Sequence, residues 1–372
     1  MINYPATIFT MKKIRMSIVT VVMILIGIGV IMIYSSSGIY ALQGLGDSEY
    51  FLKRHVLFLS LGFLLTCGVM AIDYRLIQKY SKPLIIFAIF LLCLVLIPEI
   101  GKASYGARRW FQFAGFSFQP SELAKVAMLI YVADFLSRKQ NKIRNFMDGF
   151  FPVISILSMV CLLILKQPDL GTSVLIAVIV FLMMFIAGAN LKHIGFLGLM
   201  ALPVVYFLIV KYPYRMARIT AFLDPWQDSQ GVGFQLTQSQ IALGSGGVFG
   251  VGLGKSVQKL FYLPAAHTDF ILSIIGEELG FLGAGLVVIL FVIFIVQGAR
   301  IVKRTNDAFG HFLGFGIVSM LGLQAAVNIG VSIGALPTKG LPLPFISYGG
   351  SALIFNMMLV GLLLNISRIQ DV

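Results

Sequence analysis

Charged residues are scarce in this chain, and their scarcity excludes most soluble folds. Asp, Glu, Lys and Arg make up 12% of the 372 residues, whereas hydrophobic residues make up 58% and the mean hydropathy is +0.94. Soluble domains carry about 25% charged residues, and a soluble core of this size would not enclose so much apolar surface. The apolar residues stand in continuous runs near the length of a membrane span rather than alternating with polar ones, which predicts membrane-spanning helices and not a β-barrel.

Cysteine is rare as well. Cys67, Cys93 and Cys161 each lie inside an apolar run, so we expect them to pack rather than bind a metal or form a redox pair. The net charge of +13 does not indicate a nucleic-acid-binding protein, because the basic residues are spread over short loops instead of one patch. A cleavable signal peptide is not expected, because the first apolar run, from Met16, is long enough to span and lacks a cleavage site of small residues.

Ten membrane-spanning helices are predicted, in an all-α polytopic fold with both chain ends in the cytoplasm. The predicted spans are residues 16–34, 55–72, 83–97, 120–137, 151–165, 172–187, 194–210, 270–299, 309–333 and 347–366. One membrane domain, 1–372, is expected, with a cytoplasmic N-terminal tail (1–15), a large extracytoplasmic loop between the seventh and eighth helices (211–267) and a cytoplasmic end (367–372). The outer loops hold more Lys and Arg than topology alone requires.

The most unusual polar group is His267-Thr268-Asp269, at the end of the longest polar interval and directly before an apolar run resumes. Glu277 and Glu278 follow two helical turns later. A carboxylate at mid-membrane costs roughly 2.5–3.5 kcal/mol, so these acids need a reason to be there. A helix N-cap would explain Asp269 alone, and buried hydrogen bonds would explain the glutamates. Neither explains why the histidine and the acids occur together.

Two more acidic positions on the same outer face have both a structural and a functional interpretation. Glu122 and Lys125 lie three residues apart on one helical face. They either form a buried ion pair that fixes helix packing, or Lys125 binds an anionic group of a substrate while Glu122 tunes it. Asp169 lies in a Pro-Asp-Leu-Gly turn, where it either caps the turn or contributes to a site.

Basic and hydroxyl side chains supply the same face with groups that bind phosphate. The basic residues are Arg108, Arg109, Lys166, Arg215, Arg218, Lys255 and Lys259, which either bind phosphate or extend toward the membrane surface. The segment Ser347–Ser351 either lets helices approach closely or binds diphosphate or sugar. No spacing resembles a zinc site. A Mg²⁺ ion held loosely by one or two carboxylates, with Asp269 as a candidate ligand, and by substrate phosphates fits better.

Composition and topology leave a transporter and an enzyme as alternatives. A transporter is expected to place its charges near the midplane, on broken helices of two related halves. Here the charged residues cluster toward the outer interface, which favours chemistry on a membrane-embedded substrate.

At these residues the sequence resembles the SEDS family, the FtsW/RodA group of bacterial cell-wall polymerases. The matching motifs stand in the family's order over most of the chain: Gly106-Ala107-Arg108-Arg109-Trp110, Gln119-Pro120-Ser121-Glu122-Leu123-Ala124-Lys125, Gln167-Pro168-Asp169-Leu170-Gly171-Thr172, His267-Thr268-Asp269-Phe270 and Pro344-Phe345-Ile346-Ser347-Tyr348-Gly349-Gly350-Ser351.

The resemblance implies a glycosyltransferase that polymerises lipid II into glycan strands at the outer face of the cytoplasmic (inner) membrane and releases undecaprenyl diphosphate. By position, Asp269 matches the family's essential aspartate, a candidate general base. Glu122, Lys125 and Asp169 match family positions that support activity. Further candidates for binding or supporting the substrate are Arg108, Arg109, His267, Thr268, Lys259, Glu277, Ser347, Tyr348, Gly349, Gly350 and Ser351.

The resemblance also implies partners and cofactors. The expected partners are a class B penicillin-binding protein, which is a transpeptidase, and other divisome proteins, with no nucleic acid. A divalent cation, Mg²⁺ or Mn²⁺, is the expected cofactor, and no organic cofactor is expected. Two alternatives stay open, a flippase that moves lipid II across the bilayer without forming glycan and a scaffold that recruits the transpeptidase.

Within the family, the chain is closer to the FtsW branch than to the RodA branch. Gln258–Pro264 and Leu336–Leu341 are FtsW-like, so a role at the division septum is expected rather than one in elongation. One residue departs from the pattern, because Ala265 stands where the FtsW branch commonly has an acidic residue. If that acid helps to bind metal or to orient the loop, other residues must do so here.

Overall fold

A computed structural model describes residues 4–104, 107–113, 116–260 and 262–369 of the chain. Gly106 and Phe261 of the quoted motifs, and residues 1–3 and 370–372 of the predicted tails, lie outside the described residues. Within the described ranges, seven helices are long and apolar enough to cross a membrane. These are α1 (Tyr4–Leu45), α2 (Tyr50–Ala71), α6 (Phe151–Lys166, with the π-helical turn Phe146–Phe150 before it), α8 (Leu191–Val210), α11 (Ile271–Arg304), α12 (Ala308–Ser332) and α13 (Ser351–Ile369).

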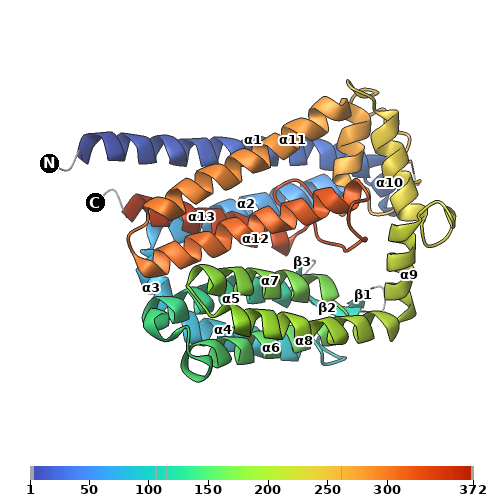
Figure 1. Ribbon diagram of the computed structural model, residues 1–372. Helices are drawn as coiled ribbons and strands as arrows, with labels where there is room; N and C mark the ends of the chain where they lie inside the picture. Colours follow the sequence, from blue (N-terminus) through green and yellow to red (C-terminus); the bar gives the residue numbers. More distant parts are fainter. Residues whose placement is uncertain (1–3, 105–106, 114–115, 261, 370–372) are drawn as a thin grey trace.

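Three more helices correspond to the remaining predicted spans. The shorter apolar helices α4 (Ser81–Leu94) and α7 (Leu170–Ile186) cover two of them. The third, α5 (Pro120–Lys139), has a lower hydropathy because it carries charged residues at both ends. The polytopic helical fold is therefore confirmed, and each predicted span falls on one helix. The amino end of α1 and the carboxyl end of α13 lie at the same end of the bundle (Figure 1).

A small sheet adds to the predicted helices. The antiparallel strands β1 (Lys102–Ser104), β2 (Ala107–Phe113) and β3 (Phe116–Phe118) follow α4, with β2 in the middle. Arg108 lies opposite Ala103, and Gln112 lies opposite Ser117. Aromatic residues are frequent here and favour strands. The sheet lies at the end of the bundle opposite the chain termini (Figure 1), which is the outer end on the predicted topology.

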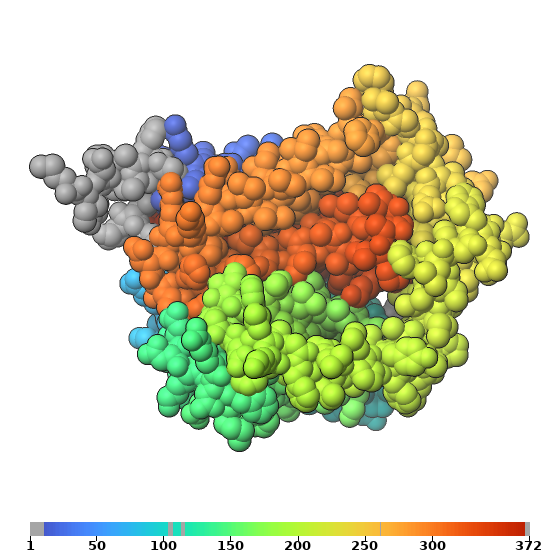
Figure 2. All heavy atoms as spheres, viewed as in Figure 1, coloured from blue at the N-terminus to red at the C-terminus, as the bar shows by residue number. Residues whose placement is uncertain are grey.

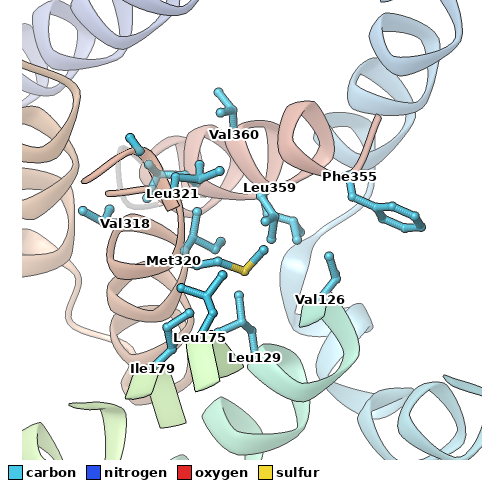
Figure 3. Close-up of a cluster of buried hydrophobic side chains, with 14 of the residues drawn as sticks. Val126, Leu129, Leu175, Ile179, Val318, Met320, Leu321, Phe355, Leu359 and Val360 are labelled. Atoms are coloured by element: carbon cyan, nitrogen blue, oxygen red, sulfur yellow. The ribbon is translucent and has the colours of Figure 1, made fainter. Parts of the chain in front are cut away.

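The helices form two groups that meet along α5, α7, α12 and α13. Figure 1 shows α1, α2, α11, α12 and α13 on one side and α4 to α8 on the other, and α12 packs against both α5 and α7. Buried side chains from four helices fill the junction (Figure 3), among them Val126, Leu129, Leu175, Ile179, Met320, Leu321, Leu359 and Val360. This shared core fixes the outer ends of α5, α7 and α12 relative to one another.

The segment after α8 is structured. It forms α9 (Pro213–Leu223) and α10 (Phe234–Ser245), and α10 packs against α11 and α12. Figure 2 shows this segment (yellow) around the outer end, with a hollow between it and the C-terminal helices (red). The remaining elements are α3 (Tyr74–Lys79), at the end of the bundle that holds the chain termini (Figure 1), and a 3-10 turn at Gln140–Lys142.

Helix α11 is broken near its start, at Gly280. Gly280 has φ +70° and ψ −168°, a conformation that only glycine adopts readily. The break is held by the preceding loop, because Val251 N–H donates to Glu277 O (2.9 Å) and Phe281 N–H donates to Gly247 O (2.9 Å). The residues before the break pack with α10 at the outer end, and the residues after it form the long span that packs on α1 (Figure 1).

Gly280→Ala tests this break. The substitution places a Cβ against Gly250 N and Val248 O and forces an alanine into a strained conformation, which costs about 1–3 kcal/mol for the backbone alone. We expect a lower unfolding temperature in detergent. Gly285→Ala, later in the same helix with nothing within 4 Å of the added Cβ, is the matched control and should not lower the unfolding temperature, because alanine favours a helix over glycine. Equal unfolding temperatures for the two variants would contradict the account of the break.

Candidate functional site

Asp269 lies in a turn directly before α11, and its carboxylate is left without a partner. Its N–H donates to Ala265 O (3.1 Å), and its carbonyl accepts from Asn328 Nδ2 (2.9 Å). Helix α11 begins after Phe270 without a side-chain cap, so the N-cap interpretation of Asp269 does not hold. Within the described part of the chain, no hydrogen bond or ion pair reaches its carboxylate oxygens.

The carboxylate of Asp269 borders a small pocket with Asn328, Lys339 and Gly340. Gly340, with φ +59°, lies so close that an added Cβ would be 3.4 Å from Asp269 Oδ2. Burial raises the pKa of Asp269 from 3.8 to about 6, while the positive charge of Arg218 acts in the opposite direction. Asp269 is therefore mostly ionised at pH 7 and has a higher proton affinity than an exposed aspartate, as a general base requires.

The segment Ser347–Ser351 holds the turn that carries Asp269. Ser347 Oγ donates to Thr268 O (2.6 Å) and accepts from Leu343 N–H (2.9 Å). Tyr348 N–H donates to His267 O (3.0 Å). Ser351 Oγ accepts from the N–H of Gln119 (3.2 Å), which links the motif to the start of α5.

The glycines of this segment permit close packing. Gly349 lies near the ring of Pro342, and Gly350, with φ +45°, lies against the ring of Phe58 on α2. The Ser347–Ser351 motif therefore supports the site with its backbone and its hydroxyl groups.

His267 belongs to an aromatic cluster beside Asp269. Its ring centroid lies 4.6 Å from that of Phe51 and 5.9 Å from those of Tyr40 and Tyr348. Burial lowers the pKa of His267 to about 4, so its imidazole is neutral at pH 7. Thr268 Oγ1 donates to Ala265 O within the same turn (3.1 Å).

Glu122 and Lys125 form a buried ion pair of 2.7 Å, with 5% and 1% of their side chains exposed. Lys125 Nζ also donates to Gln324 Oε1 (3.4 Å), and Gln324 Nε2 donates to Pro342 O (2.9 Å). The structural interpretation of the pair therefore holds. The pair links α5 to α12 and to the loop after α12.

Asp169 and Arg109 meet at the turn between α6 and α7. Asp169 caps α7 by accepting from Thr172 N–H (3.0 Å) and Oγ1 (2.9 Å). Arg109 donates from Nε to Gln167 O and from Nη2 to Pro168 O, both at 2.7 Å. Its neighbour Arg108 is exposed at the sheet. Arg109 therefore fastens β2 to the turn, and Asp169 shapes the start of α7.

Lys259, Glu277 and Glu278 form a second buried network, next to the break in α11. Lys259 Nζ lies 2.7 Å from Glu278 Oε1, and 4% and 0% of their side chains are exposed. Glu278 also accepts from Ser35 Oγ (2.7 Å). Glu277 accepts from Val257 N–H (2.8 Å) and from Ser256 Oγ. These side chains fasten residues 256–259 to α1 and α11.

The two arginines of α9 have different roles, one in packing and one near Asp269. Arg215 is buried and donates to Leu208 O (3.0 Å). Arg218, which is exposed, donates to Thr338 O (3.3 Å) and acts electrostatically on Asp269. Arg218 therefore belongs to the surroundings of Asp269, whereas Arg215 holds α9 to α8.

Sequence reasoning did not place Asn328, Gln324 or Lys339 in the site. Gln324, Asn328 and Ser332 recur every four residues in an apolar helix and so lie on one face of α12. That spacing is the signal by which Gln324 and Asn328 were recognisable. Lys339 had no such signal, because only the fold brings it beside Asp269 and next to Asp169.

The site can hold a metal ion only if a bound substrate supplies some of the coordinating atoms. Among the described residues, no group of three or more His, Cys, Asp and Glu side chains is close enough to hold one. Asp269 offers one carboxylate, beside a pocket that it lines. Mg²⁺ keeps several waters and commonly binds one or two carboxylates together with substrate phosphates, which suits this sparse set.

Comparison with known proteins identifies the family to which the chain is similar. The family described as "Cell cycle protein", which groups FtsW, RodA and SpoVE, matches residues 15–371. The chain is 48% identical over 339 residues to a "Probable peptidoglycan glycosyltransferase FtsW" of Geobacter sulfurreducens, covering 91% of each chain. It is 45% identical over 351 residues to the "Stage V sporulation protein E" of Bacillus subtilis, covering 94% of this chain and 96% of that one.

Solved structures share the fold. A chain of a peptidoglycan synthase complex, described for its coordination of polymerization and crosslinking, superposes with a TM-score of 0.76 at 28% identity, covering 95% of this chain and 97% of that one. The rod shape determining protein RodA of Thermus thermophilus gives a TM-score of 0.70 at 28% identity, covering 94% of this chain and 95% of that one.

Lys259→Met tests whether the Lys259–Glu278 pair is structural. It leaves a buried Glu278 carboxylate without its cation, which costs about 3–5 kcal/mol. We expect a much lower unfolding temperature in detergent, and recovery of most of the loss in Lys259→Met/Glu278→Gln, where neither charge remains. Lys53→Met breaks the exposed pairs with Asp47 and Glu49 and is the control, with an unfolding temperature expected to stay close to that of wild type. Similar losses in the buried and the exposed single variants would contradict the assignment.

Proposed function

The chain belongs to the FtsW, RodA and SpoVE family of cell cycle proteins, and from this premise we propose that it is a peptidoglycan glycosyltransferase that polymerises lipid II at the outer face of the cytoplasmic membrane. The observation that carries the proposal is the carboxylate of Asp269. Glu122, Asp169, Glu277 and Glu278 all have partners within the protein. Asp269, at the outer end of the bundle, keeps its carboxylate free for a substrate.

The proposed reaction uses Asp269 as the general base. A hydroxyl of the acceptor sugar attacks the anomeric carbon of the donor sugar, and its proton passes to an Asp269 carboxylate oxygen. The new C–O bond forms as the bond from the anomeric carbon to the diphosphate breaks, and undecaprenyl diphosphate leaves with the bonding electrons. Lys339 beside Asp269, and Arg218 on α9, supply positive charge for the diphosphate. A divalent cation, when bound, would neutralise further negative charge on the leaving group.

Transport of lipid II has one observation in its favour, the broken helix α11 with Glu277 and Glu278 before the break. Broken helices with charged residues form the binding sites of many transporters. In this chain both carboxylates accept hydrogen bonds from the loop that covers the break, so neither is available to a substrate. The arrangement therefore favours glycosyl transfer over transport.

A septal role with a class B penicillin-binding protein is the finer part of the proposal. Its support is the FtsW-like segments 258–264 and 336–341 and the FtsW names of relatives, while the likeness to a stage V sporulation protein makes sporulation the competing process. Ala265 does not weaken the proposal. Its carbonyl accepts from the N–H groups of Thr268, Asp269 and Phe270, so backbone hydrogen bonds help to shape the turn where FtsW commonly has an acid.

Asp269→Asn tests the proposed base. Purified protein is incubated with fluorescent lipid II and Mg²⁺, with and without the class B partner, and products are separated on a gel. Wild type should give a ladder of glycan strands, and Asp269→Asn should give none, because its amide does not accept the proton. Asp224→Asn, an exposed helix-end aspartate whose remaining side-chain oxygen can still accept from Trp226 N–H, should polymerise like wild type. A full ladder from Asp269→Asn would overturn the assignment.

The pH dependence of polymerisation tests the raised pKa of Asp269. The carboxylate is the active form, so activity is present above the pKa of about 6 and is lost as pH falls through it. At pH 5 we expect about one tenth of the plateau rate. With the ordinary pKa of 3.8, more than about nine tenths would remain at that pH. Initial rates between pH 4.5 and 8, each with a check that the protein stays folded, distinguish the two results.

A further inference from the structure

Asn328 stands out among the buried polar residues of the molecule. It lies in α12 with 2% of its surface exposed, between Gln324 one turn before and Ser332 one turn after. A buried amide without hydrogen bonds is costly in an apolar interior. The hydrogen bonds that Asn328 makes therefore indicate its role. Gln324 braces the loop after α12, and Ser332 accepts a bond from α10 through its carbonyl. Asn328, by contrast, touches the turn of the proposed base.

The amide nitrogen of Asn328 joins the two segments that form the pocket. Nδ2 donates to Asp269 O (2.9 Å) and to Leu341 O (2.8 Å), which uses both of its hydrogens. Helix α12 packs against α5, α7, α11 and α13 in the middle of the molecule, so it is a rigid support. Asn328 therefore holds the Asp269 turn and the Gly340–Leu341 loop together, beside the link that Ser347 makes between Thr268 and Leu343.

The amide oxygen of Asn328 has no partner. Oδ1 is buried and accepts no hydrogen bond, although the residue borders the same pocket as the Asp269 carboxylate. Buried polar atoms are nearly always paired, and an unpaired one commonly marks the place of a ligand or an ordered water. Asp269 and Asn328 both line one narrow pocket, and each carries an acceptor that no residue within the described ranges uses. A ligand that offers more than one hydrogen-bond donor would satisfy both acceptors.

We infer that Asn328 is the positioning residue for the proton transfer. Its Nδ2 fixes the Asp269 turn at the distance the reaction needs, and its Oδ1 accepts a hydrogen bond from a second hydroxyl or acetamide N–H of the acceptor sugar. The sugar is then held at two points, with its reacting hydroxyl against Asp269. The inference rests on the proposed function, since it specifies how the acceptor sugar meets the base.

The charged residues around the pocket do not supply the missing hydrogen bond to Asn328 Oδ1. Arg218 on α9 acts on Asp269, Lys339 borders the pocket, and Asp169 at the start of α7 acts on Lys339. None of the three donates a hydrogen bond to Asn328 Oδ1, which stays unpaired among the described residues.

Asn328→Asp separates the two tasks of the amide. It keeps an oxygen for the sugar but loses both donors to Asp269 O and Leu341 O, and it adds a carboxylate near Asp269. Misplacement of a catalytic group by about 1 Å can cost about 100-fold in rate, so we expect kcat to fall on that order while KM for lipid II changes by less than about threefold. The midpoint of the acid limb of the pH profile should rise by about one unit, because a second carboxylate raises the pKa of the first.

Asn328→Leu keeps the test decisive if the added carboxylate destabilises the protein. Leucine has a similar size and suits an apolar helix. Because this variant lacks both the amide nitrogen and the amide oxygen of Asn328, kcat should fall and KM for lipid II should rise. Ser332→Ala, on the same face of α12, removes a hydroxyl that donates to the backbone carbonyl of Asn328 within the helix and makes no hydrogen bond to Asp269 or to the Asn328 amide. It is the matched control and should match wild type in kcat, KM and pH midpoint.

The outcomes distinguish the inference from the proposed function. If the Asn328 variants give less folded protein but wild-type kcat and pH midpoint per folded molecule, Asn328 is only structural and the inference is wrong. If wild type itself forms no glycan with lipid II and the partner, the proposed function fails first. A loss of kcat with a shifted midpoint in Asn328→Asp, beside an unchanged Ser332→Ala, establishes the positioning role.

Discussion

A polar group inside a membrane bundle must find its partner within the same chain, because neither lipid nor the apolar core supplies one. This constraint accounts for the outer half of the protein. Glu122 pairs with Lys125, Glu278 pairs with Lys259, and Asp169 caps α7. Among these carboxylates of the described residues, that of Asp269 is the exception, and the surrounding structure holds its backbone in place without using the carboxylate.

The supports of Asp269 come from parts of the chain that are far apart in sequence. Asn328 on α12 donates to its carbonyl, Ser347 donates to the neighbouring carbonyl of Thr268, and Gly340 lies beside the carboxylate. The ion pair of α5 reaches the same loop through Gln324 and Pro342. Many residues of the quoted motifs are therefore engaged in contacts within the protein that connect to the Asp269 turn.

The sequence allowed the spans to be predicted well, because hydropathy is a local property and each predicted span falls on one helix. The break at Gly280 and the strands 102–118 were not predicted, since both depend on contacts with other segments. At Asp169 and Glu122 the sequence was compatible with structural and functional roles alike, and only the fold shows the cap and the ion pair. Asn328 lies 59 residues from Asp269 along the chain, so their contact could not be read from spacing.

One comparison tests the central claim most directly: polymerisation of lipid II per folded molecule by Asp269→Asn and by Lys259→Met/Glu278→Gln, measured in one series with wild type. The double variant removes a buried ion pair of the frame without leaving an unpaired charge. The account predicts that its folded molecules polymerise at nearly the wild-type rate, whereas folded Asp269→Asn makes no glycan. Glycan synthesis by Asp269→Asn would contradict the assignment of Asp269 as the base. Loss of polymerisation in a well-folded double variant would contradict the assignment of the Lys259–Glu278 pair as purely structural.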